Sequence, residues 1–502
     1  MSGAGRPAVA IARPTGWLAR PRIVLGLAGV YASSRALGLV REIGIAFFFG
    51  TSVAADRLSA AFVVASLVSI IGGEAFYAGS VRWLGEARPD PPAAVSEARY
   101  ANLVAVARSA ALASTAAFLL VGPLATLVVL GNGEGSTQAV ALAAALAPSV
   151  GAALVSACIN ARLTLERRFV LLNGAQALYS VGALIGLAFI GLFGRGIGPL
   201  PVALGWSAGN VAAAVVLYAR ARPRPRRRDS EARAFALLRI GLPIAMAYSL
   251  VAIQSLTDRT VAARIGPGRV AALSYADRLF LLPVGFVIAA LGPIVLGALV
   301  AERQQDRSVE LAAFHQLRTV VSFLVPLSLL FVACAPWLVS FVFESGHFNA
   351  QSRDLTVAAL DGFSVGIAAV AVSLVLFRMM QAVSKLREIV IVSVFAVVLN
   401  AVSTVGGALW LGLYGVTLST SLVAVALVVL QTVRLSVELG RRWATEALKC
   451  AVVPVAVCCA VSIVIVTANH RGALGDPPRA VVLVAAAAIA AALGSRKKQQ
   501  PE

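Results

Sequence analysis

The sequence predicts an all-α polytopic membrane protein with about fourteen transmembrane helices, arranged as two six-helix lobes around a central cavity plus two C-terminal helices. Three observations predict this class. The 502-residue chain is 59% hydrophobic and only 13% charged, and its mean hydropathy is +0.87. Its apolar stretches are continuous over about 20 residues, the length that a membrane-spanning helix needs. A soluble protein of this size would need more polar surface, and barrel strands would alternate apolar with polar residues.

The expected spans are delimited by the polar residues between the apolar stretches. Each stretch is long enough to cross the hydrocarbon core as a helix, and several exceed it, which a tilted helix accommodates. The predicted spans lie near 24–50, 57–84, 101–131, 136–162, 169–194, 199–220, 234–264, 270–300, 311–344, 353–381, 388–411, 414–438, 447–468 and 477–494.

The basic residues predict the orientation of these spans. If the N-terminus is cytoplasmic, the inner tails and loops hold 31 of the 43 Lys and Arg residues, and the outer loops hold seven. Lys and Arg are enriched in the cytoplasmic loops of membrane proteins. We therefore expect an even number of spans with both termini in the cytoplasm.

Two basic segments divide the chain. The first 22 residues hold four arginines and no acid, but no cleavage site follows them, which favours a retained tail over a targeting peptide. The basic stretch 220–239 favours a linker held against anionic membrane lipids, with no nucleic acid as partner. The expected divisions are a cytoplasmic tail at 1–22, an N-terminal lobe at 23–220, a linker at 221–233, a C-terminal lobe at 234–440, two helices at 441–495 and a cytoplasmic tail at 496–502.

A short internal repeat favours a duplicated architecture. The tetrapeptide Ala-Asp-Arg-Leu opens the second expected span at 55–58 and recurs near the start of the eighth at 276–279. A four-residue match is weak evidence by itself. The two copies occupy equivalent places in the two halves, as expected for transporters built from repeats.

The sequence carries no signature of a soluble enzyme. It has no phosphate-binding GxxxxGK[ST] loop, no HExxH, no GxSxG and no CxxC pair. The five cysteines lie in apolar surroundings and the three histidines are scattered, which predicts neither a disulfide framework nor a metal centre. The short outer loops leave no room for a catalytic domain.

Charged residues inside the expected spans are the strongest functional signal. Arg35, Arg41, Arg259 and Arg278 fall within or at the ends of spans, where an isolated Arg costs roughly 2.5–3.5 kcal/mol to insert. A wet cavity that binds an anion would explain the cationic excess, because Arg matches phosphate geometry. The alternative is a structural ion-pair network. Arg35 and Arg41 are about 120° apart on a regular helix, so the cavity must be wide or the helix must bend.

A second group of polar residues is expected inside the C-terminal lobe. Asp258 lies in the seventh span, and Asn400 lies in the eleventh with Thr404 one turn further on. Oxygen ligands on facing helices could hold a hard cation or a proton. The alternative is ordinary hydrogen bonding between helices.

Three stretches of the sequence resemble one family. SSRALGLVREIGIAFFFGTSVAADRLSAAF (33–62), YADRLFLLPVGFVIAALGPIVL (275–296) and LVSFVFESGHFNAQSRDLTVAAL (338–360) are similar to blocks of the MurJ (MviN) lipid II flippases, in the MOP exporter superfamily. The resemblance implies two six-helix lobes, a central cavity and alternating access. The implied substrate is an undecaprenyl-pyrophosphate-linked sugar that moves from the inner to the outer leaflet.

The resemblance also implies site residues, with no catalytic residues and no cofactor. It places a substrate site at Arg35, Arg41, Arg278, Asp56, Glu74 and Asp277. Some relatives bind sodium, and the matching positions here are Asp258, Asn400, Thr404, Val416 and Thr420. The chain is therefore expected to be coupled to sodium or protons.

Two positions depart from the family pattern. The stretch 67–73 lacks the arginine pair that usually precedes Glu74, and Thr404 stands where sodium-binding relatives have an acid. We therefore expect a divergent lipid II flippase of the bacterial cytoplasmic (inner) membrane. The alternatives are a flippase for another lipid-linked oligosaccharide, such as an exopolysaccharide or O-antigen unit, and a non-transporting scaffold for cell-wall synthesis proteins. A cationic-drug exporter is disfavoured because it would need an acidic cavity.

Overall fold

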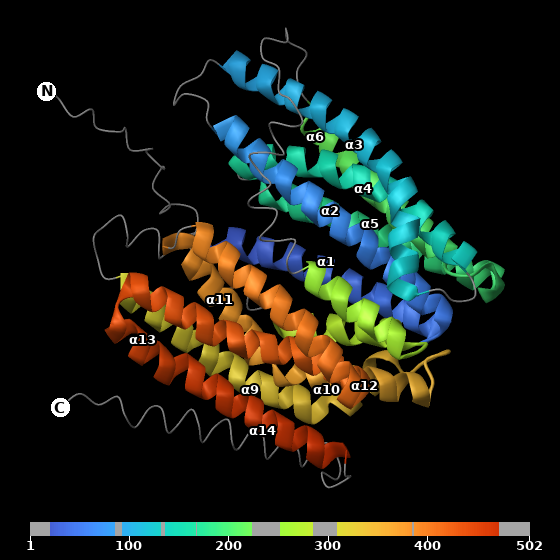
Figure 1. Ribbon diagram of the computed structural model, residues 1–502. Coiled ribbons are helices and arrows are strands. Elements are labelled where there is room, and N and C mark those ends of the chain that lie inside the picture. The colour runs from blue at the N-terminus through green and yellow to red at the C-terminus, as the bar shows by residue number, and fades with distance from the viewer. Residues whose placement is uncertain are drawn as a thin grey trace, which may run out of the picture.

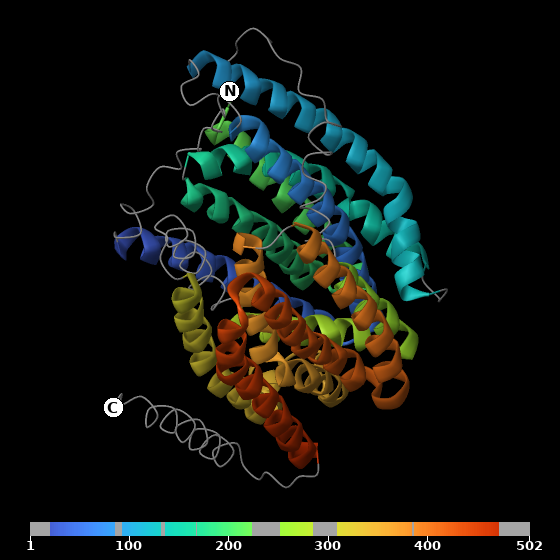
Figure 2. The same cartoon turned by 60° about the vertical axis from the view of Figure 1, so that its left-hand side comes forward.

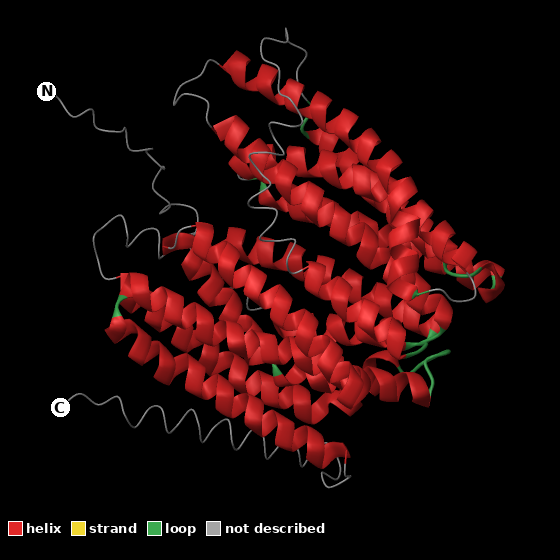
Figure 3. Ribbon diagram, in the orientation of Figure 1, coloured by secondary structure: helices red, strands yellow, loops and turns green. Residues whose placement is uncertain are grey.

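The computed structural model describes residues 21–85, 93–131, 136–166, 168–222, 252–284, 309–383 and 386–470. Within these residues every regular element is helical, as Figure 3 shows. Helices are expected for such apolar segments because a lipid-embedded backbone must satisfy its hydrogen bonds internally. The predicted all-α class is confirmed.

The N-terminal half contains six long helices, which match the first six predicted spans. The chain turns between the first two of them at Gly50, whose φ of +54° favours glycine. The helices are α1 (Pro21–Phe49), α2 (Val53–Gly85), α3 (Ala93–Leu130), α4 (Ser136–Leu165), α5 (Phe169–Phe193) and α6 (Leu200–Arg220), with a short 3₁₀ turn η1 (Arg195–Ile197) before α6.

The C-terminal half continues with helical segments at 252–265 and 269–284. The later elements are α9 (Val309–Phe343), α10 (Ala350–Val365), α11 (Ile367–Val383), α12 (Leu386–Leu439), α13 (Arg441–Ala447), the π-helical turn η2 (Leu448–Val452) and α14 (Val453–His470). Helices α10 and α11 meet at a bend of 48° and match one predicted span.

The 54-residue element α12 contains two predicted spans joined at Gly412. The backbone there has φ +59° and ψ −136°, which breaks the helix. A hydrogen bond of 2.7 Å between the hydroxyls of Thr404 and Ser419 joins the segments on either side of this break. Their glycines, Gly407 and Gly415, approach so closely that a Cβ on either would clash with the other's backbone. The two halves of α12 therefore fold back on each other as a hairpin.

In the described part of the chain, eight helices are long and apolar enough to cross a membrane, or nine if the bent pair α10–α11 is one span. The predicted spans at 234–264 and 270–300 lie partly outside the described residues, and the predicted span at 477–494 lies wholly outside them. The chain is thus a polytopic helical membrane protein. The count of fourteen spans and the division at the basic linker stay predictions.

The helices form two packed groups that meet at one end (Figures 1 and 2). Helices α2–α6 pack on one another, and α1 runs along the junction beside this first group. Helices α9–α12 pack with α14 in the second group, which the 252–265 helix joins through Asp258 and Asn400 and the 269–284 helix through Phe280 and Phe363. The groups are joined by a buried cluster that includes Phe49 and Leu58 from the first group and Tyr275, Phe343 and Phe348 from the second. At the other end the groups diverge (Figure 1), and the cavity lies between them.

Candidate functional site

The main cavity has a volume of about 630 Å³ and is lined by both groups of helices. Helices α1, α2, α4, α5 and α6 form most of the wall, and the 269–284 helix closes the other side. Its polar and aromatic lining includes Ser34, Arg35, Arg41, Ser66, Ser69, Glu74, Asn160, Asn173, Gln176, Tyr179, Trp206, Asn210 and Arg278.

The structure brings the three expected cavity arginines together. Arg35 and Arg41 reach the cavity from one continuous helix, α1, although they are six residues apart. Arg278 reaches it from the 269–284 helix of the opposite group. The cavity is wide enough for both faces of α1 to contribute. The arrangement concentrates positive charge in a partly enclosed space, where anions are favoured.

Glu42 bridges two of these arginines. Its Oε1 lies 2.5 Å from Nη2 of Arg41 and 3.3 Å from Nε of Arg278. Arg41 is also held by Trp206, whose ring centre lies 4.4 Å from the guanidinium carbon. The Arg41 side chain is 3% exposed and its Nε has no hydrogen-bond partner. The Nε–H group of Arg41 is therefore a hydrogen-bond donor without an acceptor inside the site.

Glu42 and Trp206 were not among the predicted site residues. From the sequence, Glu42 is expected only as an ion-pair partner of the intramembrane arginines, because an acid directly after an intramembrane Arg is its natural counter-ion. Trp206 could not be predicted, because nothing local in the sequence shows that α6 faces α1.

Glu74 also lines the cavity, but Asp56 lies elsewhere. The carboxylate of Asp56 accepts hydrogen bonds from the backbone N–H groups of Gly268 (2.5 Å) and Ala271 (2.7 Å). It therefore caps the N-terminus of the 269–284 helix, where unpaired N–H groups attract an anion. The structure places Asp56 at the junction of the two groups, away from the cavity lining.

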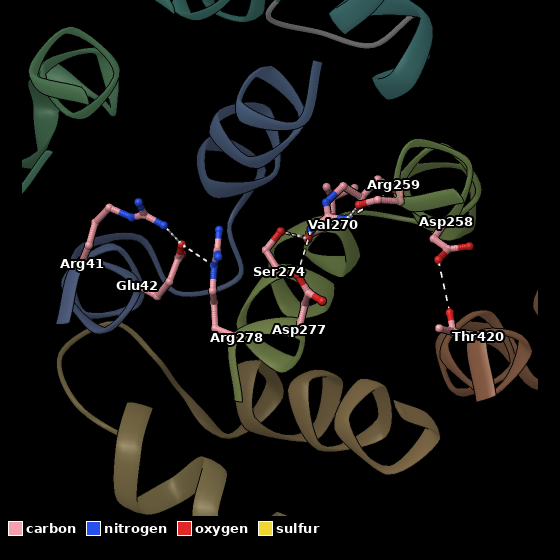
Figure 4. A network of polar contacts seen from close by, with 10 residues as sticks. Arg41, Glu42, Asp258, Arg259, Val270, Ser274, Asp277, Arg278 and Thr420 are labelled. Atoms are coloured by element: carbon pink, nitrogen blue, oxygen red, sulfur yellow. Dashed lines mark hydrogen bonds and ion pairs between the residues drawn. The ribbon is translucent and has the colours of Figure 1, made fainter. Parts of the chain in front are cut away.

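Asp277 is not among the lining residues of the cavity either. Its Oδ2 lies 3.6 Å from Nη2 of Arg259, which is 9% exposed. Arg259 also donates hydrogen bonds to the hydroxyl and carbonyl oxygens of Ser255, one turn earlier on its own helix. Figure 4 shows Arg259 extending toward the 269–284 helix while its neighbour Asp258 points toward α12.

The other four residues of the expected ion site lie around Asp258. Oδ1 of Asp258 accepts hydrogen bonds of 2.9 Å from Asn400 and from Thr404, and Oδ2 accepts one of 3.3 Å from Thr420. Thr404 also bonds Ser419, which donates to the carbonyl of Val416 at 2.6 Å. The cluster joins the 252–265 helix to both halves of α12.

The donor set around Asp258 fits a singly charged ion. It offers one carboxylate, hydroxyls that can accept as well as donate, and an amide that can present its oxygen. One negative charge matches a monovalent cation or a proton. The described residues contain no group of three or more His, Cys, Asp or Glu side chains that could hold a metal ion.

Hydrogen bonds join the two groups of helices at the C-terminal end of α1. Tyr275 donates its hydroxyl to the carbonyl of Gly50 at 2.7 Å, and the backbone N–H of His347 donates to Phe47 at 2.9 Å. The hydroxyls of Thr51 and Ser352 lie 2.9 Å apart. With the capping contact of Asp56, these bonds close the cavity at this end.

Comparison with known proteins agrees with this architecture. Residues 45–482 match the family described as lipid II flippase MurJ. A probable lipid II flippase MurJ of Rhizobium tropici is 27% identical over 361 residues, which cover 68% of this chain and 67% of that protein. A lipid II flippase MurJ of Burkholderia cenocepacia is 26% identical over 179 residues, and this match spans only 35% of either chain.

Solved structures show the same fold at low identity. A lipid II flippase MurJ in an inward closed conformation superposes with a TM-score of 0.76 at 17% identity, covering 94% of this chain and 99% of that one. An inward-facing multidrug-resistance MATE transporter of the MOP superfamily gives a TM-score of 0.64 at 16% identity, covering 89% and 100%. Since the family match extends over most of the chain, the protein belongs to the lipid II flippase MurJ family, which is a family of membrane transporters and not of enzymes.

Proposed function

We propose that this protein flips undecaprenyl-pyrophosphate-linked peptidoglycan precursor, lipid II, from the inner to the outer leaflet by alternating access. It would do so in a bacterial cytoplasmic membrane, with fourteen spans and both termini in the cytoplasm. The expected orientation puts the open end of the cavity on the cytoplasmic side, because the closed end lies at the C-terminal end of α1. The described state then faces the leaflet in which the precursor is made.

The observation that carries this proposal is the set of arginines facing one cavity. Arg35, Arg41 and Arg278 line it from opposite sides, and a guanidinium donates to phosphate oxygens in pairs. Glu42 holds Arg41 and Arg278 in place through a single oxygen, which leaves other N–H groups for a ligand. A diphosphate can accept donors from both groups of helices at once and so favour their closure around it.

The remaining geometry supports an alternating cycle. The contacts of Asp56, Tyr275 and Thr51 and the buried cluster around Phe49 hold the outer end closed. Opening it requires a ligand that binds the two states with different affinity. The sugar headgroup would occupy the polar cavity, and the polyprenyl chain would stay in the bilayer. The Asp258 cluster would hold the coupling sodium ion or proton.

A second candidate is a flippase for another lipid-linked oligosaccharide. This candidate is favoured by the part of the cavity lining that α2 provides. Ser69, Ile70 and Gly73 line the cavity there, at the place of the missing arginine pair. A drug exporter of the MATE type shares only the fold, and the cationic cavity disfavours its usual cargo. A non-transporting scaffold for cell-wall synthesis would tolerate loss of the cavity arginines, whereas a flippase would not. Anionic lipids at the linker and cell-wall synthesis proteins remain proposed partners.

The direct test is complementation of a bacterium depleted of its lipid II flippase. The wild-type chain should restore growth, and Arg278→Ala should not, whereas Arg195→Ala in the exposed outer turn should. Membrane expression of each variant is measured in parallel. Failure of the wild type despite normal expression would reject lipid II and favour the second candidate. Rescue by Arg278→Ala would favour the scaffold.

A further inference from the structure

The charged residues between the cavity and the Asp258 cluster alternate in sign. From α1 to the 252–265 helix the order is Arg41, Glu42, Arg278, Asp277, Arg259 and Asp258 (Figure 4). Two ion pairs lie within this series, Arg278 with Glu42 at 3.3 Å and Arg259 with Asp277 at 3.6 Å. The cavity and the Asp258 cluster are therefore connected by a series of neighbouring charges.

Each inner member of this series interacts with charges on both sides. Arg259 is attracted by Asp277, repelled by Arg278, and attracted by Asp258, its neighbour in sequence. Arg278 is attracted by Glu42 and by Asp277. The Arg259 side chain is only 9% exposed, so the attractions at Arg259 are weakly screened. The Arg278 side chain is 39% exposed, where it faces the cavity. A change in one charge will redistribute the others.

We propose that Arg259 and Asp277 form a positioning pair that couples the charge of Asp258 to the affinity of Arg278 for an anion. The proposal rests on the anion site of the proposed function and adds two residues that do not themselves contact substrate. Neither residue lines the cavity.

The direction of the coupling follows from the signs. When Asp258 is neutralised by a proton or a monovalent cation, Arg259 loses one of its two carboxylates and pairs more strongly with Asp277. Asp277 then holds Arg278 less strongly. Arg278 keeps Glu42 as its counter-ion and becomes more available to an anion in the cavity. Coupling is reciprocal, so an anion on Arg278 would in turn favour neutralisation of Asp258.

The local structure suits this role. Arg259 is anchored to its own helix through Ser255, so that its guanidinium needs only a small rotation to change partners. Its Nε is buried and has no hydrogen-bond partner. The 3.6 Å distance to Asp277 is an ion pair without close hydrogen bonding. Because this ion pair lacks close hydrogen bonds, a change in the neighbouring charges can strengthen it.

A direct electrostatic effect of Asp258 on the cavity is the alternative explanation for any such coupling. It would act without Arg259, because Coulomb attraction needs no intermediate. The positioning pair acts only if Arg259 and Asp277 are both present. A double-mutant cycle separates the two explanations.

The experiment is a calorimetric titration of the detergent-solubilised full chain with inorganic pyrophosphate at constant ionic strength. Asp258→Asn imitates the neutral state and should bind pyrophosphate at least about fivefold more tightly than wild type. In the Arg259→Gln background, and separately in the Asp277→Asn background, the same Asp258→Asn change should alter the affinity less than twofold. Arg259→Lys should retain the coupling. Arg264→Gln, which removes an exposed Arg from the same helix, should also retain it.

Three outcomes would overturn the proposal. Equal tightening by Asp258→Asn with and without Arg259 would show a direct electrostatic effect. No tightening in the wild-type background would show that the two sites are uncoupled, while pyrophosphate binding itself would leave the proposed anion site intact. No pyrophosphate binding by the wild type would reject the anion site and the positioning pair together.

Discussion

The cavity and the Asp258 cluster are both polar sites inside the membrane, but they balance charge in different ways. In the cavity, Glu42 is shared by two arginines and Arg41 keeps a buried Nε without a partner. In the cluster, both oxygens of one carboxylate accept hydrogen bonds from neutral side chains of α12. The cavity has spare donors for an anion, and the cluster has spare capacity for a single positive charge.

We expect from this difference that the two sites will tolerate substitutions differently. A cavity that depends on long-range charge should lose function when any arginine is removed. In a cluster that depends on close contacts, the effect of substituting a side chain should depend on its distance from Asp258. The following predictions test this contrast, beginning with the largest effect.

Arg278→Ala should reduce the transport rate by about 100-fold. A charge-assisted hydrogen bond contributes roughly 1.5–3 kcal/mol, and each 1.4 kcal/mol is a factor of ten. The rate is measured in proteoliposomes with a fluorescently labelled lipid-linked substrate. Arg195→Ala, on the exposed outer turn, is the matched control and should transport normally. A less than threefold decrease in the transport rate of Arg278→Ala would show that substrate recognition in the cavity does not depend on the charge of Arg278.

Thr404→Asp should convert the cluster from one carboxylate to two. Because Thr404 lies 2.9 Å from Oδ1 of Asp258, the new carboxylate would repel Asp258 unless a cation lies between them. We expect thermal stability to fall in sodium-free buffer and to recover with sodium, with a sodium affinity at least about tenfold above that of wild type. The stability and the sodium affinity are both obtained by measuring the melting temperature as a function of sodium concentration. Stability independent of sodium would argue against a cation at this position.

Asp56→Ala should open the outer end of the cavity. The substitution leaves the N–H groups of Gly268 and Ala271 without their acceptor, and loss of such a cap costs about 1 kcal/mol. The population of the outward-open state should rise about fivefold. Spin labels at Val53 and Gln351, which are exposed on either side of this end, report the change as a longer distance. An unchanged distance distribution would show that the cap only stabilises its helix.

Thr420→Val should have the smallest effect. Its hydroxyl makes the longest bond to Asp258, at 3.3 Å, and a neutral hydrogen bond contributes about 1 kcal/mol. The affinity for the coupling ion should fall by fivefold at most, while pyrophosphate binding stays within twofold of wild type. A larger loss of pyrophosphate affinity would mean that the hydroxyl of Thr420 also contributes to anion binding in the cavity.

The sequence predicted the spans well because their signal is local. Continuous apolar stretches, and the break between the predicted spans 388–411 and 414–438, define helices without any knowledge of their neighbours. The same holds for the arginines of α1, whose cost in lipid marks them as functional candidates. In the cluster, Asp258, Asn400 and Thr404 are predicted from their polarity inside the spans, whereas Val416 and Thr420 follow only from the resemblance. The structure supplies the contacts that bring these residues together.

The sequence could not predict which partner each charge takes. The two copies of Ala-Asp-Arg-Leu occupy equivalent places in the two halves of the sequence, but their contacts differ. Asp56 caps a helix and Arg57 donates to Gln138, whereas Asp277 pairs with Arg259 and Arg278 pairs with Glu42. These partners lie on other helices, and their proximity depends on how the two groups of helices meet.

The central claim is that the cavity arginines recognise a diphosphate on a lipid-linked glycan. The most direct measurement compares transport in proteoliposomes of two lipids with the same polyprenyl tail and sugar, one linked by a diphosphate and the other by a monophosphate. The account predicts a preference for the diphosphate of at least about tenfold, lost in Arg278→Ala. Equal rates for the two lipids in the wild type would contradict it.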